Sequence, residues 1–252
     1  RALNLSLNTV AVQVLQIAGL DETVEFARNA GITTPLRKDL SLALGASEVR
    51  LIDMVNAYAV FASGGLAMPV NWILSVGGKA VEREPYRRVM NPASAWLVTS
   101  LLRTVITEGT GRRAAHLRFP VAGKTGTTNG NRDAWFIGFS PEIVCGVWIG
   151  YDDSRPLGSR EEGGRAAVPV FAQILQQTRE WYRKGDFFIP PGITTREIDP
   201  DTGQAVLPGA PRHVTEYFLE GTEPPLPEMV PVPAVEPGAA PDATSVGDLL
   251  TR

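Results

Sequence analysis

Three consecutive segments near the middle of the chain constrain its fold more than any other feature. They cover residues 119–128, 133–140 and 143–151, and the short turns Asn129-Gly130 and Pro141-Glu142 join them. Asn-Gly is a strong hairpin signal because both residues tolerate positive φ. The second and third segments are apolar at successive positions, which is typical of strands packed on both faces. The sequence therefore predicts three consecutive antiparallel strands in the middle layer of a domain.

Helical patterns lie on both sides of these strands. Asn8–Ala18 carries apolar residues at i, i+4 spacing before Gly19, and Asn91-Pro92 provides a cap and first turn for a helix that runs to about Thr107. A further helix is expected over 169–183, and residues 69–75 and 79–84 are expected to form a hairpin around Gly77-Gly78. Helices around one sheet predict a mixed α/β fold, an antiparallel sheet with helices on both faces.

Composition excludes several classes of function. The chain has 252 residues and a net charge of −3, which is too close to neutral to indicate a nucleic-acid partner. Cys145 is the only cysteine, so neither an internal disulfide nor a cysteine-based metal site is possible. The two histidines have no second ligand at a usable spacing, and we expect no metal and no cofactor. No apolar run approaches the roughly 18 residues of a membrane span.

The residue composition changes near residue 184, and the sequence therefore predicts three parts. Residues 1–183 form the main domain. Residues 184–222 form an extension with a small hairpin, in which Ile193–Ile198 pairs with 204–207 around an Asp-Pro-Asp-Thr-Gly turn. Residues 223–252 are rich in proline and are expected to be disordered.

The first predicted strand contains Gly123-Lys124-Thr125-Gly126-Thr127-Thr128, a lysine beside a row of hydroxyls that is suited to holding an anion. A P-loop would need Gly-x-x-x-x-Gly-Lys-Ser/Thr on a strand-to-helix turn. The first glycine of that motif would fall at Arg118, and the next segment is a strand and not a helix. A P-loop is therefore excluded.

A second short motif, Ser6-Leu7-Asn8, stands at the start of the first predicted helix. Alone it indicates a helix cap, as Lys124-Thr125-Gly126 alone indicates an ordinary edge strand. Together and in this order, they match two members of the Ser-x-x-Lys, Ser-Asp-Asn and Lys-Thr-Gly set of class A β-lactamases and penicillin-binding proteins. The chain resembles the C-terminal part of the transpeptidase domain of a class A (bifunctional) penicillin-binding protein, and segments 40–65, 105–111, 123–153 and 216–222 share the resemblance.

The resemblance implies a serine β-lactamase/D,D-transpeptidase-like fold and an enzyme that cross-links peptidoglycan stem peptides of the D-Ala-D-Ala type through a serine acyl-enzyme. It also implies acylation by β-lactam antibiotics. The catalytic domain would lie in the periplasm, with an inner-membrane anchor and a glycosyltransferase domain on a preceding part of the protein.

Roles for individual residues follow from the same resemblance. Ser6 would relay a proton with the help of Lys124, and Asn8 would hydrogen-bond the substrate amide. The Thr127 N–H would be one oxyanion donor. The substrate would be held by Thr125, Gly126, Thr127 and Thr128, with the Thr125 and Thr127 hydroxyls on its terminal carboxylate.

One member of the motif set is missing. The residues three positions before the four lysines are Pro35, Val76, Val121 and Trp181, so the sequence contains no Ser-x-x-Lys. The chain also opens on Arg1 and enters a helix almost at once, and we expect the acylating serine and its lysine on a preceding segment that is not included. A non-catalytic penicillin-binding sensor or scaffold, or a D,D-carboxypeptidase or β-lactamase, stays open as an alternative.

The Lys-Thr-Gly strand carries one geometric prediction. Side chains alternate along a strand, which sends Lys124 and Thr125 to opposite faces. Both can serve one cleft only at the edge of the sheet, where Gly126 would let an extended peptide approach the backbone. We therefore expect one side of this strand to be unpaired.

Overall fold

The structure is a computed structural model, and it describes residues 1–181 and 185–227. Two compact units divide the chain: residues 1–196 with 216–223, and residues 197–215 with 224–252. The α-helices are α1 Asn8–Ala18, α2 Leu20–Asn29, α3 Leu51–Ala62, α4 Pro92–Thr107 and α5 Gly163–Gln177, and short 3-10 turns cover Leu40–Leu44, Arg112–Ala114 and Arg179–Trp181.

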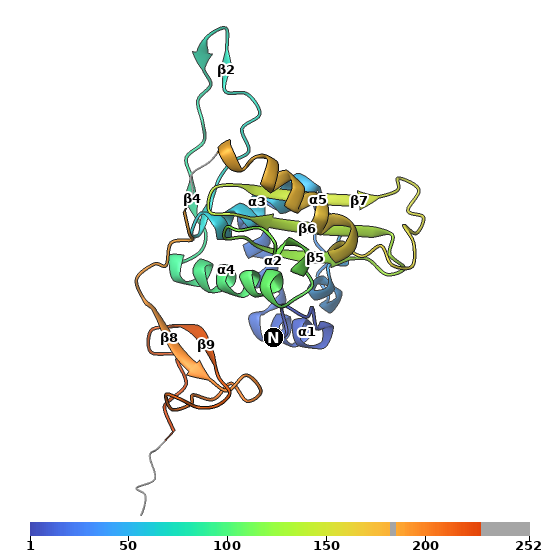
Figure 1. Cartoon of the computed structure of the whole chain (residues 1–252). Coiled ribbons are helices and arrows are strands. Elements are labelled where there is room, and N and C mark those ends of the chain that lie inside the picture. The colour runs from blue at the N-terminus through green and yellow to red at the C-terminus, as the bar shows by residue number, and fades with distance from the viewer. Residues whose placement is uncertain (182–184, 228–252) are drawn as a thin grey trace, which may run out of the picture. The chain divides into compact units, whose positions relative to one another are not determined.

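The predicted three-stranded sheet is confirmed. It contains β5 Ala122–Thr127, β6 Asp133–Phe139 and β7 Val144–Gly150, which pair antiparallel in the order β5-β6-β7 (Figure 1). The first strand begins three residues later than expected. The Asn129-Gly130 turn joins β5 to β6, and Gly130 has a φ of 74°.

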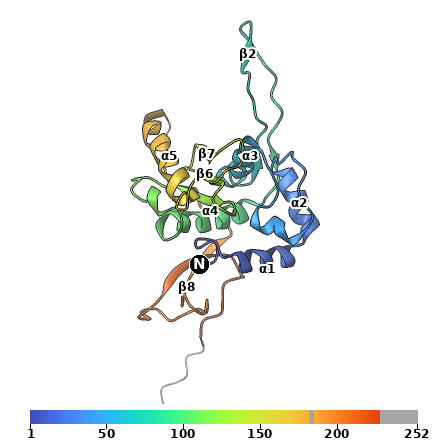
Figure 2. The same ribbon diagram turned by 90° about the vertical axis from the view of Figure 1, so that its right-hand side faces the viewer.

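Helices cover both faces of the sheet, as the mixed α/β fold predicts (Figures 1 and 2). On one face, the Phe136 ring packs edge-on against Phe171 of α5 with centroids 4.6 Å apart. On the other face, Gly146 of β7 lies against Val55 and Leu51 of α3, and Ala122 packs with residues of α4. These buried apolar layers exclude water from the middle of unit 1 and fix the position of β5.

Helices α1 and α4 begin where the sequence predicts, while the last helix, α5, does not. Helix α1 has the predicted bounds, and Asn91 caps α4 by accepting the Ala93 N–H at 2.8 Å. Helix α5 begins at Gly163, six residues before the expected start, and Pro169 lies in its interior. The predicted bounds of 169–183 are wrong, because Pro169 lies inside the helix and does not mark its start. The last residues of the predicted range, 182 and 183, lie outside the described part.

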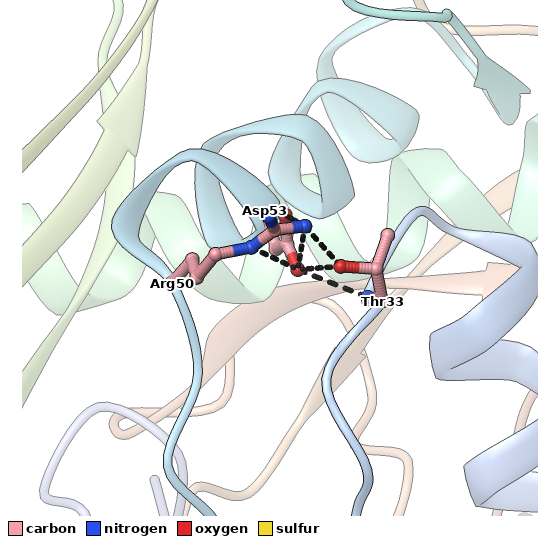
Figure 3. A network of polar contacts seen from close by, with 3 residues as sticks. All are labelled: Thr33, Arg50 and Asp53. Carbon is pink, nitrogen blue, oxygen red and sulfur yellow. Dashed lines mark hydrogen bonds and ion pairs between the residues drawn. The ribbon is translucent and has the colours of Figure 1, made fainter.

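A buried carboxylate ties the segment after α2 to the start of α3 (Figure 3). The Asp53 side chain is 6% exposed and accepts hydrogen bonds from Thr33 N at 2.9 Å and Thr33 Oγ1 at 2.6 Å. The Arg50 guanidinium lies 3.1 Å from its other oxygen and also donates to the Thr33 hydroxyl. The Thr33 N–H, the Thr33 hydroxyl and the Arg50 guanidinium thus compensate a carboxylate that is largely removed from water.

Between α3 and α4, a hairpin of unit 1 projects from the sheet and helices (Figure 1). Its base pairs β1 Leu66–Ala67 with β4 Arg87–Arg88, and its outer part pairs β2 Ser75–Val76 with β3 Lys79–Ala80. Gly77 and Gly78 have φ values of 57° and 79°, so the predicted two-glycine turn is confirmed. The paired strands are shorter than the sequence suggested.

The predicted small hairpin of the C-terminal extension pairs differently from the expectation. Strand β8 Ile193–Ile198 pairs with β9 Val214–Leu219, while the 204–207 segment contributes one bridge, Ile198 to Ala205. The Asp199 carboxylate accepts the Asp201 and Thr202 N–H groups, which forms the expected tight turn. The prediction found the turn and missed the distant partner strand.

Two further predictions concern the organisation of the chain. The boundary between 183 and 184 lies outside the described residues, as does all but the first five residues of the 223–252 segment. The three-part division therefore remains a proposal. None of the helices in residues 1–181 and 185–227 combines the length and apolar character needed to cross a bilayer.

Candidate functional site

Strand β5 has one open side, as the sequence predicted. Within the described residues it pairs only with β6. The Thr128 N–H donates to the Asp133 carbonyl just beyond the strand. Because hydrogen bonding alternates along an antiparallel pair, the N–H groups of Thr127 and Thr125 point away from β6, toward the open edge. This edge offers backbone donors and acceptors to an extended peptide.

The two sequence motifs meet at this edge. The Lys124 ammonium donates to Ser6 Oγ at 2.5 Å and to the Thr125 carbonyl at 2.9 Å, although Ser6 lies 118 residues earlier in the chain. Ser6 is not a helix cap, because α1 begins after Leu7 without any side-chain cap. The serine side chain therefore faces the lysine of the second motif.

The environment of Lys124 favours proton transfer. The side chain is partly buried, and burial lowers the pKa of its ammonium below the ordinary value because the charged form loses water. A lysine whose pKa is closer to neutral exchanges its proton more readily. The Ser6 oxygen accepts from the ammonium, which leaves the serine proton available for a third group.

Ser6 lies in a tight turn that holds it in an uncommon conformation. Its φ is 58°, in the left-handed region that a residue with a side chain seldom adopts. The Leu5, Ser6 and Leu7 N–H groups donate to carbonyls of the first three residues, which closes the turn. Asn8, the first residue of α1, is exposed, and its side chain makes no hydrogen bond within the described residues.

The neighbouring Thr125 lies on the opposite face of β5, as alternation requires. Its hydroxyl is 2.6 Å from that of Thr110, a residue of the Gly109-Thr110-Gly111 loop that follows α4. The Thr110 N–H donates to the Asn4 carbonyl at 3.1 Å. The loop after α4 thus contacts both the strand and the segment that leads to Ser6.

Thr127 and Thr128 have different partners. The Thr127 hydroxyl accepts the Gly163 N–H at 3.0 Å, at the start of α5, and keeps its own proton for another acceptor. The Thr128 hydroxyl donates to Asp133 Oδ2 at 3.0 Å and accepts the Asp133 N–H at 2.8 Å. Thr128 therefore closes the hairpin, and its role toward a substrate stays a prediction.

Gly126 packs tightly on its own sheet. A Cβ at this position would lie 3.1 Å from the Cβ of Trp135, the residue opposite it on β6. The sequence suggested that this glycine makes room for a ligand. The structure adds that the glycine also makes room for a tryptophan of the neighbouring strand.

Sequence reasoning missed two residues of this site. Neither Thr110 nor Gly163 belongs to the two motifs from which the site is predicted. Both contact the threonines of β5. The signal for Thr110 was its position between two glycines, which allows a loop to approach another backbone closely.

The assembled groups can bind an anion and move a proton. They comprise an ammonium, three hydroxyls and outward backbone N–H groups at one edge, and this set suits a carboxylate and a developing oxyanion. Within the described residues, no cluster of three or more His, Cys, Asp or Glu side chains is placed to hold a metal ion.

Comparisons with known proteins extend over most of the chain. A family model described as the penicillin binding protein transpeptidase domain matches residues 1–176. A second, described as the penicillin-binding protein 1A C-terminal domain, matches residues 189–225. The first match includes both motifs of the site.

Individual relatives give the same result. Penicillin-binding protein 1A of Aquifex aeolicus is 36% identical over 231 residues, which cover 88% of this chain and 31% of the relative. Penicillin-binding protein 2D of Bacillus subtilis is 37% identical over 238 residues, covering 89% and 34%. The crystal structure of penicillin-binding protein 1A from Haemophilus influenzae superposes with a TM-score of 0.79 at 28% identity, covering 89% of this chain and 40% of that one. The chain spans about a third of the length of the curated relatives it matches.

Proposed function

Because the chain belongs to the transpeptidase family of penicillin-binding proteins, we propose that it supplies the proton relay and the substrate-binding edge of a serine D,D-transpeptidase. The observation that carries this proposal is the hydrogen bond between Lys124 and Ser6 at the open edge of β5. The nucleophilic serine and its paired lysine come from a segment that precedes Ser6 in the full-length protein.

The first chemical step is attack of that serine on the carbonyl carbon of the penultimate residue of a stem peptide, in the bond to the terminal D-alanine. Ser6 passes a proton to the leaving D-alanine amine, and Lys124 supports the relay because its ammonium stabilises negative charge on the Ser6 oxygen. Asn8 hydrogen-bonds the substrate amide. An acceptor amine then takes the acyl group and releases the enzyme serine.

The edge of β5 positions the donor peptide. The outward N–H of Thr127 donates to the developing oxyanion, and the hydroxyls of Thr125 and Thr127 bind the terminal carboxylate. The peptide lies along the strand at Gly126 by strand addition. Thr128 completes the binding strand by holding the turn that follows it.

The whole protein to which we assign this chain is inferred from its relatives, which are about three times as long as the part that this chain matches. We assign to it an inner-membrane anchor and a glycosyltransferase domain N-terminal to these residues, with the transpeptidase domain in the periplasm. Its ligands are stem peptides ending in D-Ala-D-Ala and β-lactam antibiotics, and it needs no metal or cofactor for the acyl transfer.

A labelled-penicillin assay on the full-length protein tests the proposal. The wild type is expected to form a covalent adduct that survives denaturation. Ser6→Ala and Lys124→Ala are each expected to slow acylation by about 10²- to 10⁴-fold, the usual contribution of an acid–base group. A folded full-length protein that forms no adduct would refute the proposal.

The fate of a donor peptide separates the transpeptidase from its alternatives. Incubation with a pentapeptide ending in D-Ala-D-Ala and an amine acceptor should give the new amide. Release of D-alanine without that amide would indicate a D,D-carboxypeptidase. A stable penicillin adduct without either product would indicate a non-catalytic sensor or scaffold.

A further inference from the structure

The loop after α4 connects the two halves of the site through one residue. Thr110 donates its N–H to the carbonyl of Asn4, and its hydroxyl lies 2.6 Å from that of Thr125. Asn4 is two residues before Ser6, and Thr125 is next to Lys124. The contacts therefore form a closed circuit. Thr110 binds the segment before Ser6, Ser6 binds Lys124 of β5, and the next residue of β5, Thr125, binds Thr110.

The loop has little freedom to move away from either neighbour. A Cβ at Gly109 would lie 2.3 Å from the Asn4 carbonyl oxygen, and a Cβ at Gly164 of α5 would lie 2.6 Å from the Thr110 carbonyl oxygen. These backbones are in contact without intervening side chains. The Thr110 peptide is therefore held between the Ser6 segment and the start of α5.

This connection links groups of the site that lie on different faces of β5. Lys124 and Thr125 extend to opposite faces of β5. An element that passes around the edge of the strand is therefore needed to fix the positions of both side chains relative to each other. The turn at Ser6 also needs support, because a left-handed conformation persists only where its surroundings fix it. Thr110 contacts the segment before that turn and the far face of the strand.

We propose that Thr110 is a positioning residue, which holds the Ser6 turn against Lys124 and orients the Thr125 hydroxyl through its own. This inference rests on the proposed transpeptidase function. Thr110 acts through Thr125 and through the backbone of Asn4.

The side-chain part of this role can be separated from the backbone part. Thr110→Val removes the hydroxyl and keeps the shape, while Thr110→Ser keeps the hydroxyl. In the full-length protein, Thr110→Val should slow acylation by labelled penicillin about tenfold, and Thr110→Ser should stay within about twofold of the wild type. Thr107→Val, at the exposed end of α4, is the control and should acylate at the wild-type rate.

A double-variant cycle tests whether Thr110 acts through Thr125. If it does, Thr110→Val should add little to the loss that Thr125→Val already causes, because residues in one network are not additive. Multiplicative losses would overturn the coupling. If Thr110→Val does not fold, as judged by its melting temperature, Thr110→Ala replaces it in both experiments.

The outcomes distinguish this inference from the function on which it rests. A wild type that is not acylated refutes the proposed function, and the role of Thr110 falls with it. A wild type that is acylated, together with a folded Thr110→Val variant of equal rate, overturns the role of Thr110 alone. A slow Thr110→Ser variant would also overturn it, since the hydroxyl would then not be the operative group.

Discussion

At the scale of single residues, two charged side chains with restricted access to water behave in opposite ways. Burial alone would raise the pKa of Asp53, but hydrogen bonds from Thr33 and then those from Arg50, with its positive charge, outweigh burial and lower it. Lys124 has no carboxylate partner among the described contacts, and burial lowers its pKa. Asp53 thus stabilises the fold, while the lowered pKa of Lys124 fits the proton-relay role that we propose for it.

Replacing Asp53 with asparagine should reveal this stabilisation as a function of pH. The folded-state pKa of Asp53 lies below its unfolded value near 3.9, so its contribution is fully present above that pH and is lost as pH falls through the folded pKa. At pH 7, Asp53→Asn should lower the free energy of unfolding by about 1–3 kcal/mol, the range for hydrogen bonds to a charged group. Urea unfolding of both proteins between pH 7 and pH 3 measures the difference, which should shrink at the acid end.

An exposed ion pair provides the matched control. Asp21 pairs with Lys38 at 2.6 Å, but both side chains are more than half exposed. Asp21→Asn should therefore change stability far less than Asp53→Asn at pH 7. Equal losses for the two variants would mean that the Asp53 network does not stabilise the fold.

At the scale of elements, the start of α5 is built against the backbone of the sheet. A Cβ at Gly163 would lie 2.5 Å from the carbonyl oxygens of Gly126 and Trp135. The Gly163 N–H also donates to Thr127. The helix can approach β5 this closely only because its first residue lacks a side chain, and this contact explains why α5 begins earlier than its sequence pattern suggested.

Gly163→Ala should therefore destabilise the protein although alanine is the better helix former. The intrinsic gain is at most about 1 kcal/mol, while the clash with two backbone oxygens should cost more, for a net loss of about 1–3 kcal/mol. Gly185→Ala is the control, because a Cβ there meets no atom of the described residues within 4 Å. Thermal unfolding of both variants decides the matter, and a Gly163→Ala variant as stable as the control would contradict the prediction.

At the scale of the whole molecule, the proposed function assigns to this chain only one side of the active site. The chain carries the Ser-x-Asn turn and the Lys-Thr-Gly strand, and its sequence contains no Ser-x-x-Lys. The 252-residue chain alone is therefore expected to form no covalent adduct with labelled penicillin. The full-length protein is the positive control, and circular dichroism of the chain confirms that it is folded. A stoichiometric adduct on a serine of this chain would show that the assignment of the nucleophile is wrong.

The sequence predicted the parts of the fold that local chemistry determines. Asn91 and Pro92 specify the start of α4, Asn129-Gly130 specifies the β5–β6 turn, and Gly77-Gly78 specifies the outer hairpin turn. Each depends on the φ preferences or capping groups of a few adjacent residues. The resemblance to penicillin-binding proteins, carried by two short motifs, is confirmed by the family match.

Tertiary structure decided what depends on distant partners. Ile193–Ile198 pairs with a strand about twenty residues further on because burial and backbone pairing, and not turn chemistry, select the partner. The start of α5 is set by the backbone of β5, which no local pattern encodes. The sequence determined which residue types this site contains and that its strand must lie at an edge. The family resemblance led us to expect Ser6 near Lys124, but no pattern in this sequence places them together or places Thr110 against Thr125. Contacts across more than a hundred residues, or around a strand edge, arise from packing and leave no periodic signal.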